Sequence, residues 1–189
     1  MQDRPIGPAD VANVLLRARA TYVIVGAHAT NGYTGRPRAT VDVDVIALHP
    51  KKAAKALAAA FPHLTVRDTP VVIRFLDDDH EAIDVMKPVG SPLWRALLKD
   101  RVSLRVGNAK VNVPTVEGVL AGKFAAMVSP HRRLADKQID AGDLMRIVEA
   151  NGQLNASRLE SLGELVYSGG GKELLKLVAD ARAGRRLQF

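Results

Sequence analysis

The chain has 189 residues, and with 47% hydrophobic and 25% charged residues it has the composition of a folded globular protein rather than of a disordered or collagen-like chain. The absence of cysteine excludes disulfides, thiolate metal sites and cysteine nucleophiles, and it fits a cytoplasmic location. A net charge of +7 favours polyanionic partners such as RNA or nucleotide phosphates. The sequence contains no run of roughly 20 apolar residues, the length needed to cross a bilayer, so we expect no membrane partner.

The first part of the chain predicts alternating helices and strands. Apolar residues within 9–20 fall near one helical stripe and predict a helix, and the β-branched run at 22–25 predicts a buried strand that stops at Gly26. After a polar loop, residues 40–47 alternate between apolar side chains and aspartate and predict a second strand. The other predicted elements are an alanine-rich helix at 51–60, strands at 64–67, 71–76, 82–86, 102–106 and 110–113, and a hairpin tip at 77–81.

From Thr115 onward the pattern is helical. Thr115 is a suitable cap for a helix that runs to Met127, and further helices are predicted at 134–150, 156–166 and 172–183. The segment Ser168-Gly-Gly-Gly-Lys172 lacks both the first glycine and the final Ser or Thr of a phosphate-binding loop, so it predicts a turn between helices. We therefore expect an α/β part with a mixed sheet at 1–114 and a helical lobe at 115–189.

Two carboxylates share one face of the strand predicted at 40–47. Because side chains alternate along a strand, Asp42 and Asp44 project to the same side and repel each other. A divalent cation with oxygen ligands would relieve that repulsion. The alternative is that the strand lies at a sheet edge with a solvated outer face, where alternating Val and Asp also occurs.

A third carboxylate, Asp84, interrupts the apolar strand predicted at 82–86. If this strand lies beside the one that carries Asp42 and Asp44, the three carboxylates converge and can hold two magnesium ions, as in enzymes that transfer phosphoryl or nucleotidyl groups. The alternative is an ion pair between Asp84 and an arginine such as Arg74.

The order Gly26-Ala27, then Asp42-Val-Asp44, then Asp84 resembles the nucleotidyltransferase superfamily that includes DNA polymerase beta and kanamycin nucleotidyltransferase. It resembles still more closely the AbiEii-like nucleotidyltransferases, a group of abortive-infection toxins. The similarity runs from about residue 22 to residue 148. Its other parts are the strand that enters Gly26, the segment 36–40, the segment 113–118 that enters a helix with Lys123, and Arg132-Arg133 followed by Asp140 and Asp143.

The resemblance implies a role for each matching residue. Asp42, Asp44 and Asp84 would form the metal site, with Asp84 assisting in removing a proton from the acceptor, and Lys123 would be the fourth catalytic residue. The implied nucleotide-binding residues are Gly26, Ala27, Arg36, Arg38, Lys123, Asp140 and Asp143. Ala27 departs from the family pattern, which has glycine or serine there, so the backbone amide is kept and a hydroxyl contact is lost. Without the resemblance, Lys123 is an exposed helix lysine, Asp140 and Asp143 form a solvated helix face, and Arg38 neutralises the carboxylates.

The expected function is therefore a Mg²⁺-dependent transfer of a nucleoside monophosphate from a nucleoside triphosphate to a hydroxyl group, with Mn²⁺ as a substitute ion. The resemblance further implies a toxin that is restrained by an antitoxin protein, with tRNA as an acceptor. The alternatives are a catalytically silent relative that binds a nucleotide or a protein, and an enzyme that transfers nucleotides to proteins.

Overall fold

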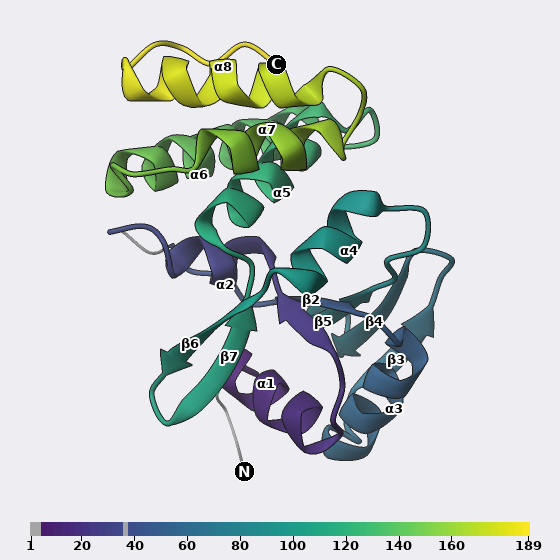
Figure 1. Ribbon diagram of the computed structural model, residues 1–189. Coiled ribbons are helices and arrows are strands. Elements are labelled where there is room, and N and C mark those ends of the chain that lie inside the picture. The colour runs from purple at the N-terminus through teal and green to yellow at the C-terminus, as the bar shows by residue number, and fades with distance from the viewer. Residues whose placement is uncertain (1–4, 36–37) are drawn as a thin grey trace.

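The computed structural model describes residues 5–35 and 38–189, which form a sheet-containing part and a stack of helices (Figure 1). The described helices are α1 (Pro8–Arg17), α2 (Gly26–Asn31), α3 (Pro50–Ala60), α4 (Pro92–Lys99), α5 (Val116–Val128), α6 (Leu134–Ala150), α7 (Ala156–Glu164) and α8 (Gly170–Arg182). The strands are β1 (Tyr22–Ile24), β2 (Val43–Ala47), β3 (Thr65–Asp68), β4 (Val72–Asp77), β5 (His80–Met86), β6 (Val102–Val106) and β7 (Ala109–Val113). The predicted mixed α+β class is confirmed.

A five-stranded sheet with the order β1-β2-β5-β4-β3 forms the centre of the first part. Strands β2 and β5 run parallel, and the other neighbouring pairs are antiparallel. The register places Asp44 opposite Asp84 on one side of β5 and Arg74 opposite Asp84 on the other. Because β2 is a central strand with a neighbour on each side, the alternative of a solvated sheet edge is wrong for Asp44.

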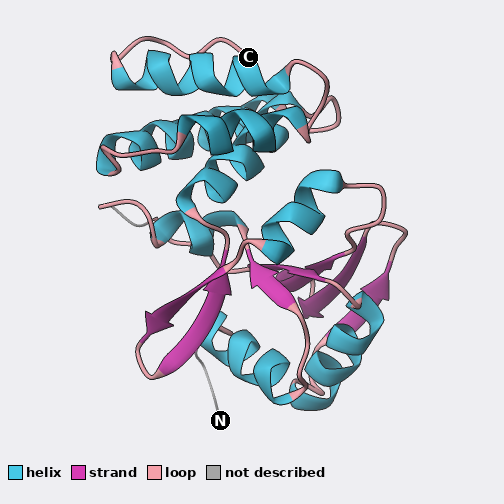
Figure 2. Ribbon diagram, in the orientation of Figure 1, coloured by secondary structure: helices cyan, strands magenta, loops and turns pink. Residues whose placement is uncertain are grey.

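Helices cover both faces of the sheet (Figure 2). The helices α1 and α3 pack together below it, while α2 and α4 lie on the opposite face, next to α5. Alternation along β2 follows from this arrangement: Val43 and Val45 are fully buried, whereas Asp44 between them lines a cleft on the α4 side. The predicted division at residue 114 falls between β7 and α5.

Most predicted elements are confirmed within a few residues, but α4 was not predicted. Its segment follows Pro88 and Gly90 and begins with Pro92, and these residue types are typical of turns. Pro92 instead occupies the start of the helix, where a missing N–H costs nothing, and the Ser91 hydroxyl accepts a hydrogen bond from the Trp94 amide at 3.2 Å.

The glycine run at 169–171 lies where a turn between helices was predicted, but Gly170 and Gly171 are already the first two residues of α8. A Cβ on Gly163 of α7 would lie 2.7 Å from the Gly170 carbonyl oxygen, and a Cβ on Gly171 would lie 2.5 Å from that of Glu160. The backbones of α7 and α8 are therefore in direct contact, which a larger residue would prevent. No helix in the described ranges has the length and apolar character needed to cross a lipid bilayer.

Candidate active site

A cleft of about 830 Å³ lies between the sheet and the helices α4, α5 and α6. Among the residues predicted for the site, those that line it are Gly26, Ala27, Arg38, Asp42, Asp44, Asp84, Lys123 and Asp140. Asp143 is fully buried and does not line it, and Arg36 lies outside the described residues. The fold therefore gathers residues that are as far apart in sequence as Gly26 and Asp140.

The three predicted carboxylates line the floor of this cleft. Asp44 and Asp84 are direct neighbours in the parallel pair formed by β2 and β5. Asp42 is not on a strand, because β2 begins at Val43 rather than at Thr40 as predicted. The Thr40 hydroxyl donates to the Asp42 carboxylate at 2.6 Å, and this contact holds the residue in the loop before β2.

Like charges surround Asp44. Its pKa rises from 3.8 to about 7, first because the side chain is removed from water and then because Asp42 and Asp84 repel a third negative charge. Lys123 and Arg132 oppose the shift only in part. Negative charge therefore predominates around Asp44, and this favours a divalent cation beside it.

We expect Asp44→Asn to stabilise the metal-free protein at pH 8 by about 2 kcal/mol and to have little effect near pH 4. Since the folded-state pKa lies above the ordinary value, the folded chain keeps a proton that the unfolded chain releases, and stability falls as the pH rises from 4 through 7. The asparagine variant has no such loss. Urea unfolding in EDTA at both pH values measures the difference, and an equal effect at the two pH values would contradict the prediction.

Asp84 has the ion pair that the alternative interpretation predicted. The Arg74 guanidinium donates to both carboxylate oxygens of Asp84, from Nε at 2.9 Å and from Nη2 at 2.8 Å, and also pairs with Glu81. Asp84 is thus both a neighbour of Asp44 and a partner of Arg74. Within the ranges 5–35 and 38–189, no three acidic or histidine side chains lie close enough to form a ready-made metal site.

Position 26 requires glycine because its backbone lies against the Asp44 carboxylate. It begins α2 with φ at +61°, and a Cβ at this position would lie 2.0 Å from the Asp44 carboxylate oxygen Oδ2. The backbone joins the two segments as well, since the Val25 amide donates to the Asp44 carbonyl at 2.9 Å. The glycine motif and the first acidic motif are therefore one packed unit.

Lys123 is buried, contrary to the interpretation of an exposed helix lysine. Its ammonium group donates to Asp140 at 2.9 Å and to Asp143 at 2.7 Å. Arg132 donates to the second oxygen of Asp140 at 2.6 Å. Because both aspartates are buried, a solvated acidic face on α6 is also excluded.

Asp143 joins the sheet part to the helical lobe. Besides Lys123, it accepts hydrogen bonds from Arg146 at 2.5 Å and from Arg38 at 3.4 Å. Burial pushes the pKa of Asp143 upward, but the hydrogen bonds and charges of these cations hold it below the ordinary value. Asn31 fixes the Arg38 backbone, accepting from its amide at 3.0 Å and donating to its carbonyl at 2.8 Å. The loop that leads to Asp42 is thus held from both parts of the fold.

The structure adds cleft residues that were not predicted as site residues. Arg132 lines the cleft, and its signal was its place in a basic pair just before an acidic helix. Trp94 and Arg74 also line it. Trp94 was missed together with α4, and Arg74 was considered only as a partner of Asp84.

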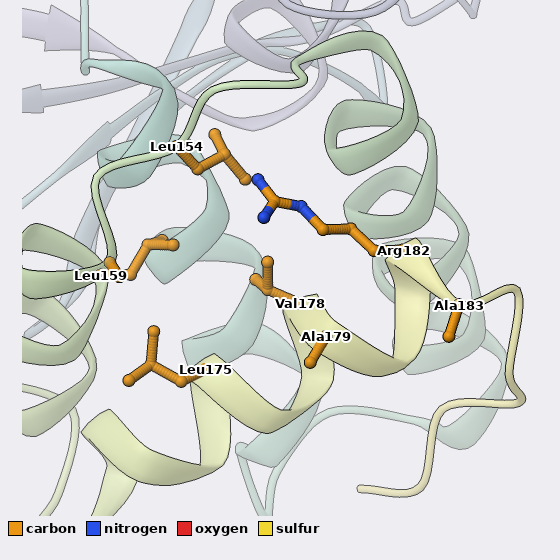
Figure 3. A pocket seen from close by; sticks show the side chains of 8 residues that line it. Leu154, Leu159, Leu175, Val178, Ala179, Arg182 and Ala183 are labelled. Atoms are coloured by element: carbon orange, nitrogen blue, oxygen red, sulfur yellow. The ribbon is translucent and has the colours of Figure 1, made fainter.

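A second cavity, of about 420 Å³, lies in the helical lobe and is mainly apolar (Figure 3). Leu159, Leu175 and Val178 line it, and Arg182 at its border donates to the Gly152 carbonyl at 3.1 Å. None of the predicted site residues contributes to it. The cleft beside the sheet is therefore the candidate active site.

No protein-family model matches the chain, and no curated protein matches its sequence. Solved structures match its fold. An antigenic nucleotidyltransferase-like protein from Paracoccidioides brasiliensis superposes with a TM-score of 0.56 at 18% identity, covering 89% of this chain and 90% of that one. The antibiotic-resistance factor ANT(2'')-Ia gives 0.55 at 12% identity, with 93% and 94% covered. JHP933 from Helicobacter pylori gives 0.52 at 16% identity, with 92% and 86% covered. The chain has the nucleotidyltransferase fold that the sequence predicted.

Proposed function

We propose that the chain is a nucleotidyltransferase that transfers a nucleoside monophosphate from a nucleoside triphosphate to a hydroxyl group. The observation that carries the proposal is the pairing of Asp44 with Asp84 beside Asp42, on the floor of a cleft that Lys123 and Arg132 also line. The similarity in fold to the nucleotidyltransferase-like protein and to ANT(2'')-Ia supports it.

The donor set fits magnesium only in part. Carboxylate oxygens are the ligands that this ion prefers, and the mutual repulsion around Asp44 favours a cation there. Asp42 and Asp44 are therefore the residues that would hold it. Asp84 can join them only when Arg74 turns away, because Arg74 engages both of its oxygens. When bound, the ion supplies positive charge to the phosphate oxygens and lowers the pKa of the acceptor hydroxyl.

In the proposed reaction, the acceptor oxygen attacks the α-phosphorus, the bond from that phosphorus to the bridging oxygen breaks, and pyrophosphate leaves. The proton of the hydroxyl passes to Asp84 once Arg74 has turned away from that carboxylate. Arg132 and Arg38, whose side chains are 44% and 37% exposed at the cleft, bind the phosphates. Lys123 adds positive charge beneath the bound phosphates. Hydrogen bonds to Asp140 and Asp143 hold its ammonium group in place.

The finer parts of the proposal follow from the resemblance to the AbiEii-like group. It assigns the chain to the toxins of toxin–antitoxin pairs, with an antitoxin protein as partner and tRNA as acceptor. The net charge of +7 supports an acceptor that is a polyanion. A catalytically silent relative is the second candidate, favoured by Ala27 at the position of the family's Gly or Ser and by the engagement of Asp84 with Arg74.

Incubation with each α-labelled nucleoside triphosphate, Mg²⁺ and total tRNA tests the proposal. We expect label on the RNA from the wild type, with Mn²⁺ supporting the reaction, and a background signal from Asp44→Asn. The matched control is Asp79→Asn, which removes an exposed carboxylate in the β4–β5 turn outside the cleft and keeps the activity. A parallel incubation with lysate proteins detects a protein acceptor. Failure of the wild type to label either acceptor would favour the silent relative.

A further inference from the structure

The cleft has two chemically different ends. Around the carboxylates it is ionic, with Arg38, Lys123 and Arg132 among its lining residues. A second part of its lining is apolar, and the residues of that part come from the sheet, α4 and α5. They are Ile46, Met86, Trp94, Leu97, Gly118 and Val119. The apolar end has no role in the phosphate chemistry described above.

The sheet places the apolar end next to the carboxylates. Ile46 and Met86 follow Asp44 and Asp84 by two residues, so they lie on the same face of the sheet, and they are themselves neighbours in the register. A molecule that reaches the carboxylates can therefore extend directly over this apolar surface.

Trp94 is the single tryptophan of the chain, and it lines this end of the cleft from α4. It is only partly buried, and among the described residues its ring pairs with no other aromatic ring. Its flat surface beside the apolar lining residues suits a planar ring, because stacking on an indole tolerates any heteroaromatic face.

Two glycines of α5, Gly118 and Gly122, line the cleft, but close packing requires glycine at only one of them. A Cβ on Gly118 would lie 2.8 Å from the Pro114 Cβ and 2.9 Å from the Leu97 Cδ2, so a larger residue does not fit. A Cβ on Gly122 would meet no atom within 4 Å. A glycine inside a helix destabilises it relative to alanine, yet here it leaves open space beside the cleft instead of relieving a contact.

We propose that the apolar end, with Trp94 as its stacking surface and the space over Gly122 as its entrance, binds a nucleobase. This inference rests on the proposed function, since it extends the nucleotide site from the phosphates to the ring. The base belongs either to the donor triphosphate or to the nucleoside that carries the acceptor hydroxyl. The chemistry is the same in both cases.

Tryptophan fluorescence reports binding directly, because Trp94 is the sole tryptophan. The wild type is titrated with ATP, GTP, CTP and UTP, with inorganic tripolyphosphate, and with short oligo(A) and oligo(U) RNAs, each with and without MgCl₂. We expect quenching by a nucleoside triphosphate or by RNA and none by tripolyphosphate. Quenching by triphosphates assigns the base to the donor, and quenching by RNA alone assigns it to the acceptor. Equal quenching by tripolyphosphate would overturn the proposal.

Variants then separate stacking from folding. In equilibrium dialysis, Trp94→Ala should weaken binding of the quenching ligand roughly 5- to 100-fold, and Trp94→Phe should restore most of it. Gly122→Leu should weaken it at least about tenfold without lowering the Tm, because leucine is the better helix former. The matched control is Gly142→Leu in α6, outside the cleft, where a Cβ meets only the tip of Arg146 at 3.8 Å. Tripolyphosphate binding should be the same in all four.

The failure of this inference differs from the failure of the proposed function. If triphosphates bind and are transferred but neither Trp94→Ala nor Gly122→Leu weakens binding, the base site is elsewhere and the nucleotidyltransferase proposal stands. If the triphosphates quench and the variants weaken binding but no label is transferred, the base site stands and the chain is a silent relative. If neither triphosphates nor RNA bind, both proposals fall.

Discussion

Replacing Lys123 with methionine is expected to lower the free energy of unfolding by about 3 kcal/mol, equivalent to a fall in Tm of roughly 6–12 °C for a chain of this length. The methionine fills a similar volume but removes the cation between Asp140 and Asp143, both of which are buried. Arg132, Arg38 and Arg146 still pair with the two carboxylates from outside, so we expect a large loss of stability rather than a failure to fold.

Urea unfolding at neutral pH measures this loss. The matched control is Lys55→Met. Lys55 is an exposed lysine of α3, far in sequence from the buried cluster of Lys123, Asp140 and Asp143, so its replacement should change stability by less than about 0.5 kcal/mol. A cycle with Asp143→Asn distinguishes the mechanism. If the loss comes from carboxylates left without their cation, the second substitution recovers part of it. Equal losses in the Lys123 and Lys55 variants would contradict the cluster's role.

Replacing Gly26 with alanine is expected to abolish nucleotidyl transfer and to destabilise the fold by about 2–4 kcal/mol. The left-handed backbone at φ +61° costs a side chain about 1–2 kcal/mol. The new methyl group also overlaps the Asp44 carboxylate, which must move out of its place beside Asp84. Label transfer and urea unfolding measure the two effects.

Gly90→Ala is the matched control for this variant. Gly90 has φ at +72°, but a Cβ there meets nothing within 4 Å, so the substitution adds the backbone strain without the contact. We expect it to lose about 1–2 kcal/mol and to keep its activity. Adding Asp44→Ala to Gly26→Ala should recover stability but not activity. If Gly26→Ala behaves like Gly90→Ala in both assays, the close approach of Gly26 to Asp44 contributes neither to label transfer nor to stability.

The sequence was sufficient to predict the strands of the sheet and the places of Asp44 and Asp84 on two of them, because the relevant patterns are local. Alternation of valine and aspartate indicated which side chains of β2 share a face, and the isolated Asp84 indicated a partner. The chain order of the motifs then predicted the nucleotidyltransferase fold. The predicted assignment of a role to each carboxylate remains a prediction.

Properties that depend on distant contacts could not be predicted. Whether Arg74 pairs with Asp84 depends on the register of β4 and β5. The structure contains this ion pair, which was the alternative interpretation of Asp84, and a metal-binding role for Asp84 stays a prediction. The burial of Lys123 depends on α6 packing against α5, which the composition of α5 alone does not reveal. Helix α4, and Trp94 with it, was hidden by prolines and a glycine whose local preference for turns the tertiary structure overrides.

The register of β5 also determines where the chain tolerates a change of length. Asp84 is fixed on both sides, by Asp44 in β2 and by Arg74 in β4. An indel of a single residue between His80 and Asp84 would rotate the aspartate to the α1 and α3 side of the sheet and bring Ile83 or Val85 into the cleft. The turn at Asp78 and Asp79 precedes this paired stretch and lies outside the cleft lining, so natural or engineered insertions are best accommodated there.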